Sequence, residues 1–194
     1  VQGNRLDVVR IDLETGIART HAMGNENTYD FLVLPDGSVP AKSDYNEATG
    51  DWSISVRDGG GWRVAHRLNA PIDTPDIEAL TENGDAVFIS MLDSGTGNWR
   101  MHPVSLANAT LGAPTLPPEA RSLLRDENAR AIGYVTADET WNYHFFDPAR
   151  EATWQLISSS LRGRLVTFTS ATPDFSKLVF YVEGAGHPGN FVLF

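Results

Sequence analysis

The segment LPDGSVPAKSDYNEATGDW, residues 34–52, carries a Pro-Asp-Gly turn and a tryptophan that lies 16 residues after Asp36. Both features recur along the chain, and together they decide the fold. The aromatic landmarks, each of which follows a loop and opens a β-rich run, are Trp52, Trp99, Trp141 and Phe191. They are separated by 47, 42 and 50 residues. A period of this length indicates a repeated structural unit of several short strands.

A second series of landmarks keeps step with the aromatic residues. Its members are Leu34-Pro35-Asp36-Gly37, Thr81-Glu82-Asn83-Gly84, Arg125-Asp126-Glu127-Asn128 and Thr172-Pro173-Asp174-Phe175. Proline presets φ, aspartate and asparagine hydrogen-bond their own backbone, and glycine or asparagine accepts a positive φ, so each segment is suited to join two strands tightly. Two landmarks in register predict four-stranded antiparallel blades of a β-propeller.

We therefore predict an all-β chain that forms one partial β-propeller over residues 1–194, with about three complete blades and two partial ones. The predicted divisions are the outer strands of a blade at 1–23, complete blades at 29–70, 75–116 and 120–160, and an incomplete blade at 164–194. Within the first complete blade the expected strands cover residues 31–34, 38–43, 52–58 and 62–68. Prolines 114, 117 and 118 obscure the outer strand of the next blade, although proline is tolerated at a sheet edge. The best helical candidate, residues 118–124, falls where the repeat expects an inner strand.

Two other arrangements are compatible with the same pattern. Any all-β chain with a turn every 8–12 residues can imitate a repeat, so a β-sandwich remains an alternative. The strands of the two partial blades could also combine and close a small four-bladed ring. An open arc of blades would instead expose apolar faces, which favours aggregation or pairing with a second copy or with further blades of the same protein.

Two stretches resemble the N-terminal propeller of the prolyl oligopeptidase family of serine peptidases. The first is Asp12-Leu13-Glu14-Thr15-Gly16 with the strand before it, and the second runs from Tyr181 to Phe194 through Pro188-Gly189. The resemblance implies a parent enzyme with an α/β-hydrolase domain outside this chain and a propeller that limits which peptides reach the catalytic serine. The D-x-x-T-G pattern is also similar to TolB-like propellers. The chain has no Glu-Glu pair of the kind that the dipeptidyl-peptidase branch uses, so an oligopeptidase or acylaminoacyl-peptidase-like parent fits better.

Composition and charge exclude several classes of function. The formal net charge of −10 repels phosphate backbones, so we expect no nucleic-acid partner. No stretch approaches the roughly 20 consecutive apolar residues of a membrane helix, and we expect a soluble protein without a membrane contact. The absence of cysteine excludes disulfides and thiol chemistry, and it suits a cytoplasm and a bacterial periplasm alike.

The sequence predicts no catalytic residue, metal site or cofactor of its own. No G-x-S-x-G segment, zinc motif or phosphate-binding loop occurs. Residues 93–98 are similar to a calcium loop but lack its alternating acidic ligands, so we interpret them as a strand connection. His187, in a Gly-rich loop, is a weak candidate for substrate contact, whereas the other histidines are interpreted as structural. The four landmark aromatics are interpreted as core residues of the repeat, in preference to a platform for sugars.

We thus expect a non-catalytic propeller segment that gates or positions peptide substrate for a prolyl-oligopeptidase-like serine hydrolase domain. Its expected partners are the remainder of its own chain or a second copy, and, in the parent protein, peptide. The alternative is a TolB-like propeller that acts as a protein-binding scaffold with no enzyme attached.

Overall fold

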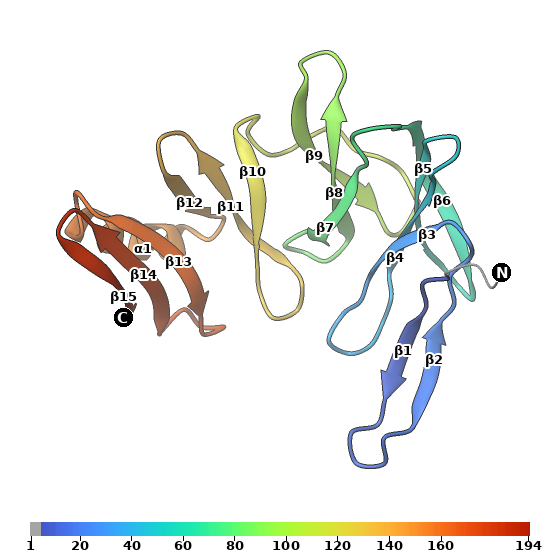
Figure 1. Cartoon of the computed structure of the whole chain (residues 1–194), viewed down its shortest axis with the longest axis horizontal. Coiled ribbons are helices and arrows are strands. Elements are labelled where there is room, and N and C mark those ends of the chain that lie inside the picture. The colour runs from blue at the N-terminus through green and yellow to red at the C-terminus, as the bar shows by residue number, and fades with distance from the viewer. Residues whose placement is uncertain (1–4) are drawn as a thin grey trace. The chain divides into compact units, whose positions relative to one another are not determined.

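The computed structural model describes residues 5–194, which contain fifteen β-strands and one α-helix. The strands form five small sheets, and each sheet is built from strands that follow one another in the sequence (Figure 1). Every strand pair in these sheets is antiparallel. The chain is therefore all-β in class, as predicted, and it consists of several small antiparallel sheets.

The chain divides into two compact units, and the first comprises Val1–Pro118 with Asn128–Arg130. Its described part contains a two-stranded, a four-stranded and a three-stranded sheet. The strands are β1 (Val8–Ile11) and β2 (Ala18–Ala22), then β3 (Thr28–Leu32), β4 (Ala41–Asn46), β5 (Asp51–Asp58) and β6 (Gly61–Asn69), then β7 (Asp76–Leu80), β8 (Ala86–Asp93) and β9 (Asn98–Ser105).

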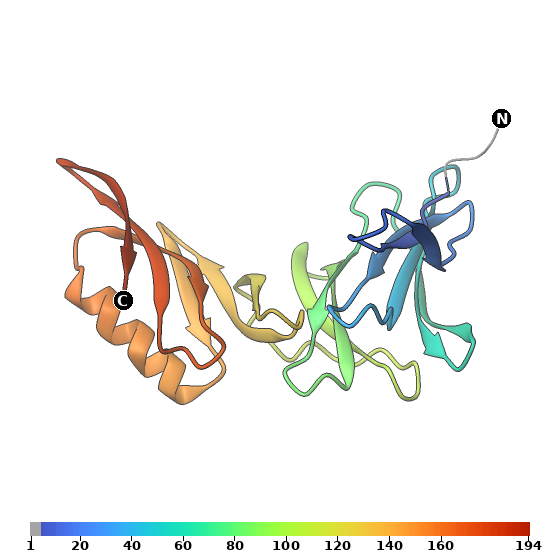
Figure 2. The same ribbon diagram turned by 90° about the horizontal axis from the view of Figure 1, so that it is seen from below.

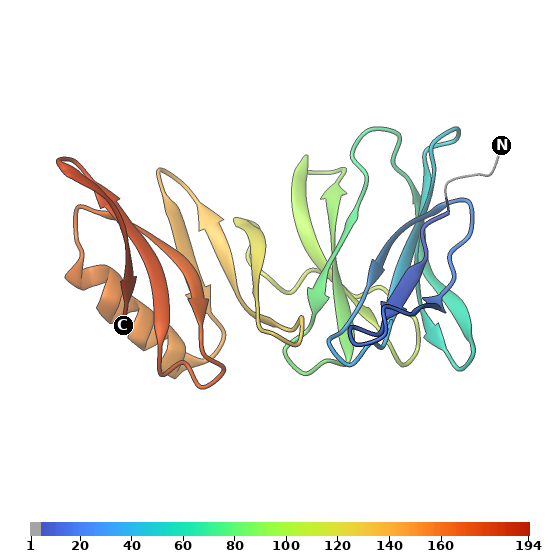
Figure 3. The same cartoon turned by 60° about the horizontal axis from the view of Figure 1, so that its bottom comes forward.

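The core of the first unit lies between the β3–β6 sheet and the β7–β9 sheet, which Figure 3 shows next to each other. Alternate residues of a strand point to the same face, so Trp52, Ile54 and Val56 of β5 enter this core together. Val87 and Ile89 of β8 meet them and are fully buried. Burial of each such side chain contributes about 1.5–3 kcal/mol, so this interface accounts for much of the unit's stability.

The second unit comprises Glu119–Glu127 with Ala131–Phe194 and holds two three-stranded sheets and the helix. Its elements are β10 (Ala120–Arg125), β11 (Ala131–Ala137), β12 (Trp141–Phe145), α1 (Pro148–Ser160), β13 (Leu165–Ala171), β14 (Leu178–Gly184) and β15 (His187–Leu193). Trp154 and Ile157 of α1 are buried against an aromatic core that includes Phe145 and Phe180. Figure 2 shows the helix alongside the strands of this unit.

The helix is the main departure from the predicted strands. Residues 120–160 were expected to form four strands, but the sheet there ends at its third strand, β12, and α1 follows. The Asp147 carboxylate accepts the backbone N–H groups of Ala149 and Arg150 at 2.8 and 2.9 Å, and Pro148 occupies the first turn. An aspartate cap followed by proline is a strong helix start, and it outweighs the preference of the repeat for another strand.

The number of strands per sheet also differs from the prediction of three complete four-stranded units. Among residues 5–194 only the β3–β6 sheet has four strands. After β9 a single bridge joins Val104 to Leu111, and the chain then runs through Pro114, Pro117 and Pro118 without forming a strand. Proline has no N–H to donate to a ladder, which explains why the predicted outer strand of 75–116 is absent.

Three of the turn landmarks form the same kind of connection, between the first and second strands of their sheets. Gly37, Gly84 and Phe175 each donate their N–H to the carbonyl three residues earlier, at 2.8–2.9 Å. All three residues have positive φ, and so does Ala129 in the turn between β10 and β11. Asp36 and Asp174 each accept a hydrogen bond from the backbone N–H of the serine two residues later. The predicted turn chemistry is therefore present at three landmarks, whereas the fourth connection has its positive φ at Ala129, one residue after the landmark 125–128.

A second connection recurs in three sheets with the pattern Asp/Asn-x-x-Thr-Gly. It covers residues 12–16, 46–50 and 93–97. In each, the first side chain accepts the N–H groups of the two residues before the glycine, and the glycine N–H donates to the first residue's carbonyl. The glycines have φ of 67–73°, a conformation that favours glycine. Residues 93–97 are thus a hairpin turn, as interpreted from the sequence.

Ala129 occupies a left-handed conformation, with φ of 58°, where two equivalent turns have glycine. A side chain in this region costs about 1–2 kcal/mol, and part of that cost returns as greater freedom of glycine in the unfolded chain. We expect Ala129→Gly to raise the free energy of unfolding by about 0.5–1 kcal/mol. Urea denaturation followed by circular dichroism measures this. Gly37→Ala is the matched control and should lower stability by a similar amount; the same sign for both variants would contradict the explanation.

The Asp174 turn makes a defined contribution to acid sensitivity. Hydrogen bonds from the Thr172 hydroxyl and from the N–H and hydroxyl of Ser176 lower the pKa of Asp174 from 3.8 to about 2. A lowered folded-state pKa stabilises the fold above pH 3.8, and this stabilisation is lost as the pH falls from 3.8 towards 2. We expect Asp174→Asn to make the loss of stability over this interval shallower. A carbon-detected NMR titration of the Asp174 carboxyl with a midpoint near 3.8 would refute the assignment.

Candidate functional site

A polar hollow of about 610 Å³ lies on the first unit, at one end of the β3–β6 sheet. Most of its lining is amide, carboxylate or hydroxyl. The ten lining residues are Asn25, Asn27, Asp44, Tyr45, Asn46, Asp51, Trp52, Ser53, Arg67 and Leu68. The hollow is therefore suited to hydrogen bonding with a polar ligand.

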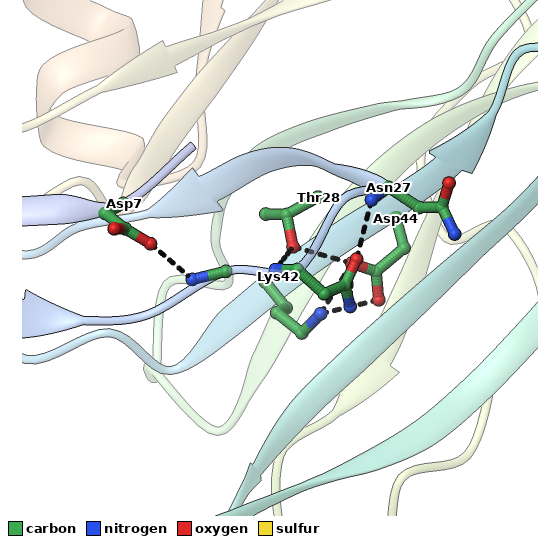
Figure 4. Close-up of polar contacts among 7 residues, drawn as sticks. Asp7, Asn27, Thr28, Lys42 and Asp44 are labelled. Carbon is green, nitrogen blue, oxygen red and sulfur yellow. Dashed lines mark hydrogen bonds and ion pairs between the residues drawn. The ribbon is translucent and has the colours of Figure 1, made fainter. Parts of the chain in front are cut away.

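A buried ion pair, of which Asp44 also lines the hollow, lies beside it (Figure 4). The Lys42 ammonium lies 2.5 and 2.6 Å from the two carboxylate oxygens of Asp44. The Lys42 side chain is 5% exposed and that of Asp44 is 19% exposed. The Asn25 amide and the Thr28 hydroxyl also donate to Asp44, at 3.1 and 2.9 Å. With the lysine and two neutral donors, the charge of the Asp44 carboxylate is largely compensated.

The loop before β3 is held by its own polar groups. The Thr28 hydroxyl accepts the N–H of Asn25 at 2.8 Å, and the Asn25 side chain accepts the N–H of Asn27 at 2.7 Å. Asp7 accepts the N–H of Gly24 at 2.9 Å, which ties the start of the described chain to this loop (Figure 4). The two bonds within residues 25–28 join near neighbours in the sequence, so they fix this part of the loop locally.

Strand register places a polar row across one face of the sheet. Thr28 pairs with Asp44, Asp44 with Ser53, and Ser53 with Arg67. Direct cross-strand partners share a face, so these four side chains lie on the same side of the sheet. Asp51 belongs to the next row and accepts hydrogen bonds from Thr49 and Asn69, which lower its pKa.

The polar and charged groups of the hollow are suited to hold a ligand. Arg67 is exposed, and no ion pair joins it to another residue within 5–194. A guanidinium beside asparagine amides can hold carboxylate or carbonyl oxygens. None of the ten lining residues is a histidine that could act as a base for Ser53. The hollow thus offers hydrogen-bond donors and acceptors to a polar ligand.

The structure separates the four landmark aromatics that the repeat had grouped as core residues. All four lie on the third strand of their sheet. Trp52 is 1% exposed and belongs to the core, whereas Trp99 is partly buried. Trp141 and Phe191 expose 52% and 70% of their surface, so the described residues do not bury them. The four aromatic residues therefore share a position in their sheets but differ in how far they are buried.

The histidine predicted to contact substrate differs from the others in what the structure describes of it. The side chain of His187, the weak candidate for substrate contact, lies outside the described residues, although its backbone begins β15. The His102 ring contacts the Gly112 carbonyl at 3.1 Å, and His144 contacts the Thr136 hydroxyl at 3.4 Å and stacks on Tyr134. Burial, reinforced by the charge of His102, lowers the pKa of His66. These partners are those of structural histidines.

Within residues 5–194 there is no cluster of three or more histidine, aspartate or glutamate side chains that could hold a metal ion. No helix in this part of the chain is long and apolar enough to cross a membrane. The sequence did not single out the polar hollow, although Lys42, Asp44 and Asn46 at alternate strand positions signal a polar face.

Comparisons of the chain with models of known protein families, with curated proteins and with solved structures found no match.

Proposed function

We propose that this chain is a non-catalytic segment of a β-propeller that gates or positions peptide for a serine hydrolase domain of the prolyl oligopeptidase type. The observation that carries the proposal is the recurrence of one turn geometry between the first and second strands of three sheets, together with a positive φ in the corresponding connection of a fourth. A propeller is built from such successive sheets, each of which covers an apolar face of its neighbour. The hydrophobic core that β3–β6 and β7–β9 share supports the proposal.

The peptide part of the proposal is supported by the polar hollow and by the resemblance of two segments to peptidase propellers. Arg67, the asparagine amides and Ser53 offer donors for the carbonyl and carboxylate oxygens of a peptide. A propeller without chemistry of its own would act by limiting access to a catalytic serine on another domain.

A TolB-like scaffold is the second candidate, and a second recurring hairpin is compatible with it. The Asp/Asn-x-x-Thr-Gly hairpin recurs at residues 12–16, 46–50 and 93–97 with one hydrogen-bonding pattern. This pattern is typical of TolB-like propellers as well as of peptidase propellers. In this alternative the exposed faces bind another protein, and no hydrolase is attached.

The coding sequence on both sides of the chain distinguishes the two candidates. A downstream G-x-S-x-G segment, followed by the aspartate and histidine of a triad, is the result expected for a peptidase. In that case, removal of residues 1–194 from the enzyme should increase cleavage of long peptides relative to short fluorogenic ones. A reading frame that encodes only further repeats would overturn the peptidase proposal and leave the scaffold.

A further inference from the structure

The outer edge of β12 has no strand partner among the described residues. The sheet order is β10-β11-β12, so β12 pairs only with β11. In the four-stranded sheet the corresponding place is taken by β6. Here the chain turns into α1 instead, and the position of a fourth strand beside β12 is left without one.

The register identifies which backbone groups of β12 point to this edge. Phe145 donates its N–H to the Glu151 carboxylate at 2.7 Å, whereas the N–H of the next residue, Phe146, bonds the Ile132 carbonyl. In an antiparallel pair, alternate residues direct both backbone groups to the same side. Tyr143 and Trp141 therefore point their N–H and C=O groups outward, as Phe145 does. Within residues 5–194 no hydrogen bond occupies these four groups.

A groove of about 260 Å³ follows this edge. One wall consists of Thr140 and the first four residues of β12, and the other walls are α1 and the start of β13 with Arg164 before it. Glu151 also lines the groove, and its carboxylate already accepts the Phe145 N–H and the Gln155 amide, at 2.7 and 2.8 Å. The groove therefore runs along Trp141 and Tyr143, where the backbone groups are available.

The groove also has a charged and an apolar contact for side chains. Arg164 is exposed and has no ion pair with any residue in the range 5–194. Trp141 is 52% exposed and presents an aromatic surface. The guanidinium at one wall favours an acidic side chain of a ligand, and the indole at the other favours an apolar one. An extended peptide directs successive side chains to opposite sides, so a peptide with alternating acidic and apolar residues can make both contacts.

We infer that an extended peptide with an acidic residue adds as a strand to the outer edge of β12, with its acidic side chain beside Arg164. The backbone of Trp141 and Tyr143 supplies two donors and two acceptors, which match the hydrogen-bonding groups of one more strand. Such strand addition takes its affinity from main-chain bonds and its selectivity from the alternating side chains. The inference rests on the second unit alone and does not require a hydrolase domain.

The test uses the whole chain and a fluorescein-labelled peptide, acetyl-Thr-Val-Glu-Val-Thr-Val-amide, with binding followed by fluorescence anisotropy. The matched variants are Trp141→Ala and Trp141→Pro. Both remove the indole, but only proline removes the outward N–H, and proline is tolerated at the first residue of an edge strand. We expect Trp141→Pro to bind about tenfold more weakly than Trp141→Ala, which corresponds to one hydrogen bond.

Three further measurements make the result decisive. A peptide with N-methyl groups on alternate residues should lose binding, and hydrogen exchange at the Tyr143 amide should slow in the complex with the unmethylated peptide. Arg164→Gln should weaken binding of the glutamate peptide several-fold and leave a peptide with glutamine at that position unaffected. Circular dichroism confirms that each variant is folded.

The inference is overturned if the peptide fails to bind the folded chain at millimolar concentration. Equal binding by the two Trp141 variants, or undiminished binding of the N-methylated peptide, would also overturn it, because the contact would then not be made through the strand edge. All of these outcomes are read on the isolated chain, so they are independent of whether the gene encodes a hydrolase.

Discussion

Replacing Trp154 with alanine is expected to destabilise the second unit by about 3–5 kcal/mol, the cost of removing a large aromatic side chain from a packed core. Trp154 is 4% exposed. Its ring lies edge-on to Tyr143, Phe168 and Phe180, with centroids 5.3–6.3 Å apart. The variant leaves a cavity in the contact between α1 and the strands, where few atoms can move in to fill it. Chemical denaturation monitored at Tyr and Trp fluorescence measures the loss.

An exposed residue of α1 provides the control variant for Trp154→Ala. Leu156 is two residues away on the same helix and is 66% exposed. Leu156→Ala removes a side chain of α1 without a cavity, so the free energy of unfolding should change by less than about 0.5 kcal/mol. Similar losses for the two variants would show that α1 does not pack in the orientation described.

Replacing Asp44 with alanine is expected to destabilise the first unit by about 3 kcal/mol. The Lys42 side chain is 5% exposed, so removal of its carboxylate partner leaves an ammonium group in a poorly solvated place. Breaking a buried pair in this way costs far more than the pair itself contributes, because the remaining charge has lost both water and its partner. The nearest compensation is the Trp62 ring, whose centroid is 5.8 Å from the ammonium nitrogen.

Two comparisons separate this effect from a general loss of charge. Asp58→Ala breaks the exposed pair with Arg63, where the Asp58 side chain is 58% and the Arg63 side chain 42% exposed, and should change stability by less than about 1 kcal/mol. The double replacement Lys42→Met with Asp44→Leu removes both charges and should recover most of the stability lost in Asp44→Ala. If the double variant is as unstable as the single one, the explanation by an uncompensated charge is wrong.

The connections between strands were the part of the fold that the sequence predicted best. Pro-Asp-Gly and Asp-x-x-Thr-Gly act through neighbouring backbone groups, so their geometry depends on a few residues that the sequence places together. The burial of the aromatic landmarks could not be predicted in the same way. Trp52 and Trp141 have similar local contexts, but the burial of each depends on what lies across its sheet.

The helix was missed although its start signal is present in the sequence. Asp147-Pro148 with Glu151 in the first turn is a recognisable helix N-terminus, and Trp154, Ile157 and Leu161 follow at helical spacing. The repeat period favoured a strand at this place, and the local signal was the stronger physical determinant. Because α1 forms in place of a fourth strand, the outer edge of β12 has no strand partner among the described residues.

The polar hollow could not be predicted from the sequence, for a different reason. Period two predicts that Lys42 and Asp44 share a face, but the placement of Thr28 and Arg67 on that same face requires the register of four strands. Register depends on turn length and on a bulge in β6 opposite Ile54 and Ser55, which local pattern does not reveal. A site assembled across several strands is therefore visible only once the sheet is built.

Each sheet is made only of strands adjacent in the chain, so the loops that must close during folding are short. Short loops carry a small entropic cost, and proteins dominated by local contacts fold faster than those that join distant segments. All four strands of the β3–β6 sheet are available for pairing once residue 69 has left the ribosome. Synthesis and folding can then advance together, one sheet at a time, with little unpaired strand exposed at any moment.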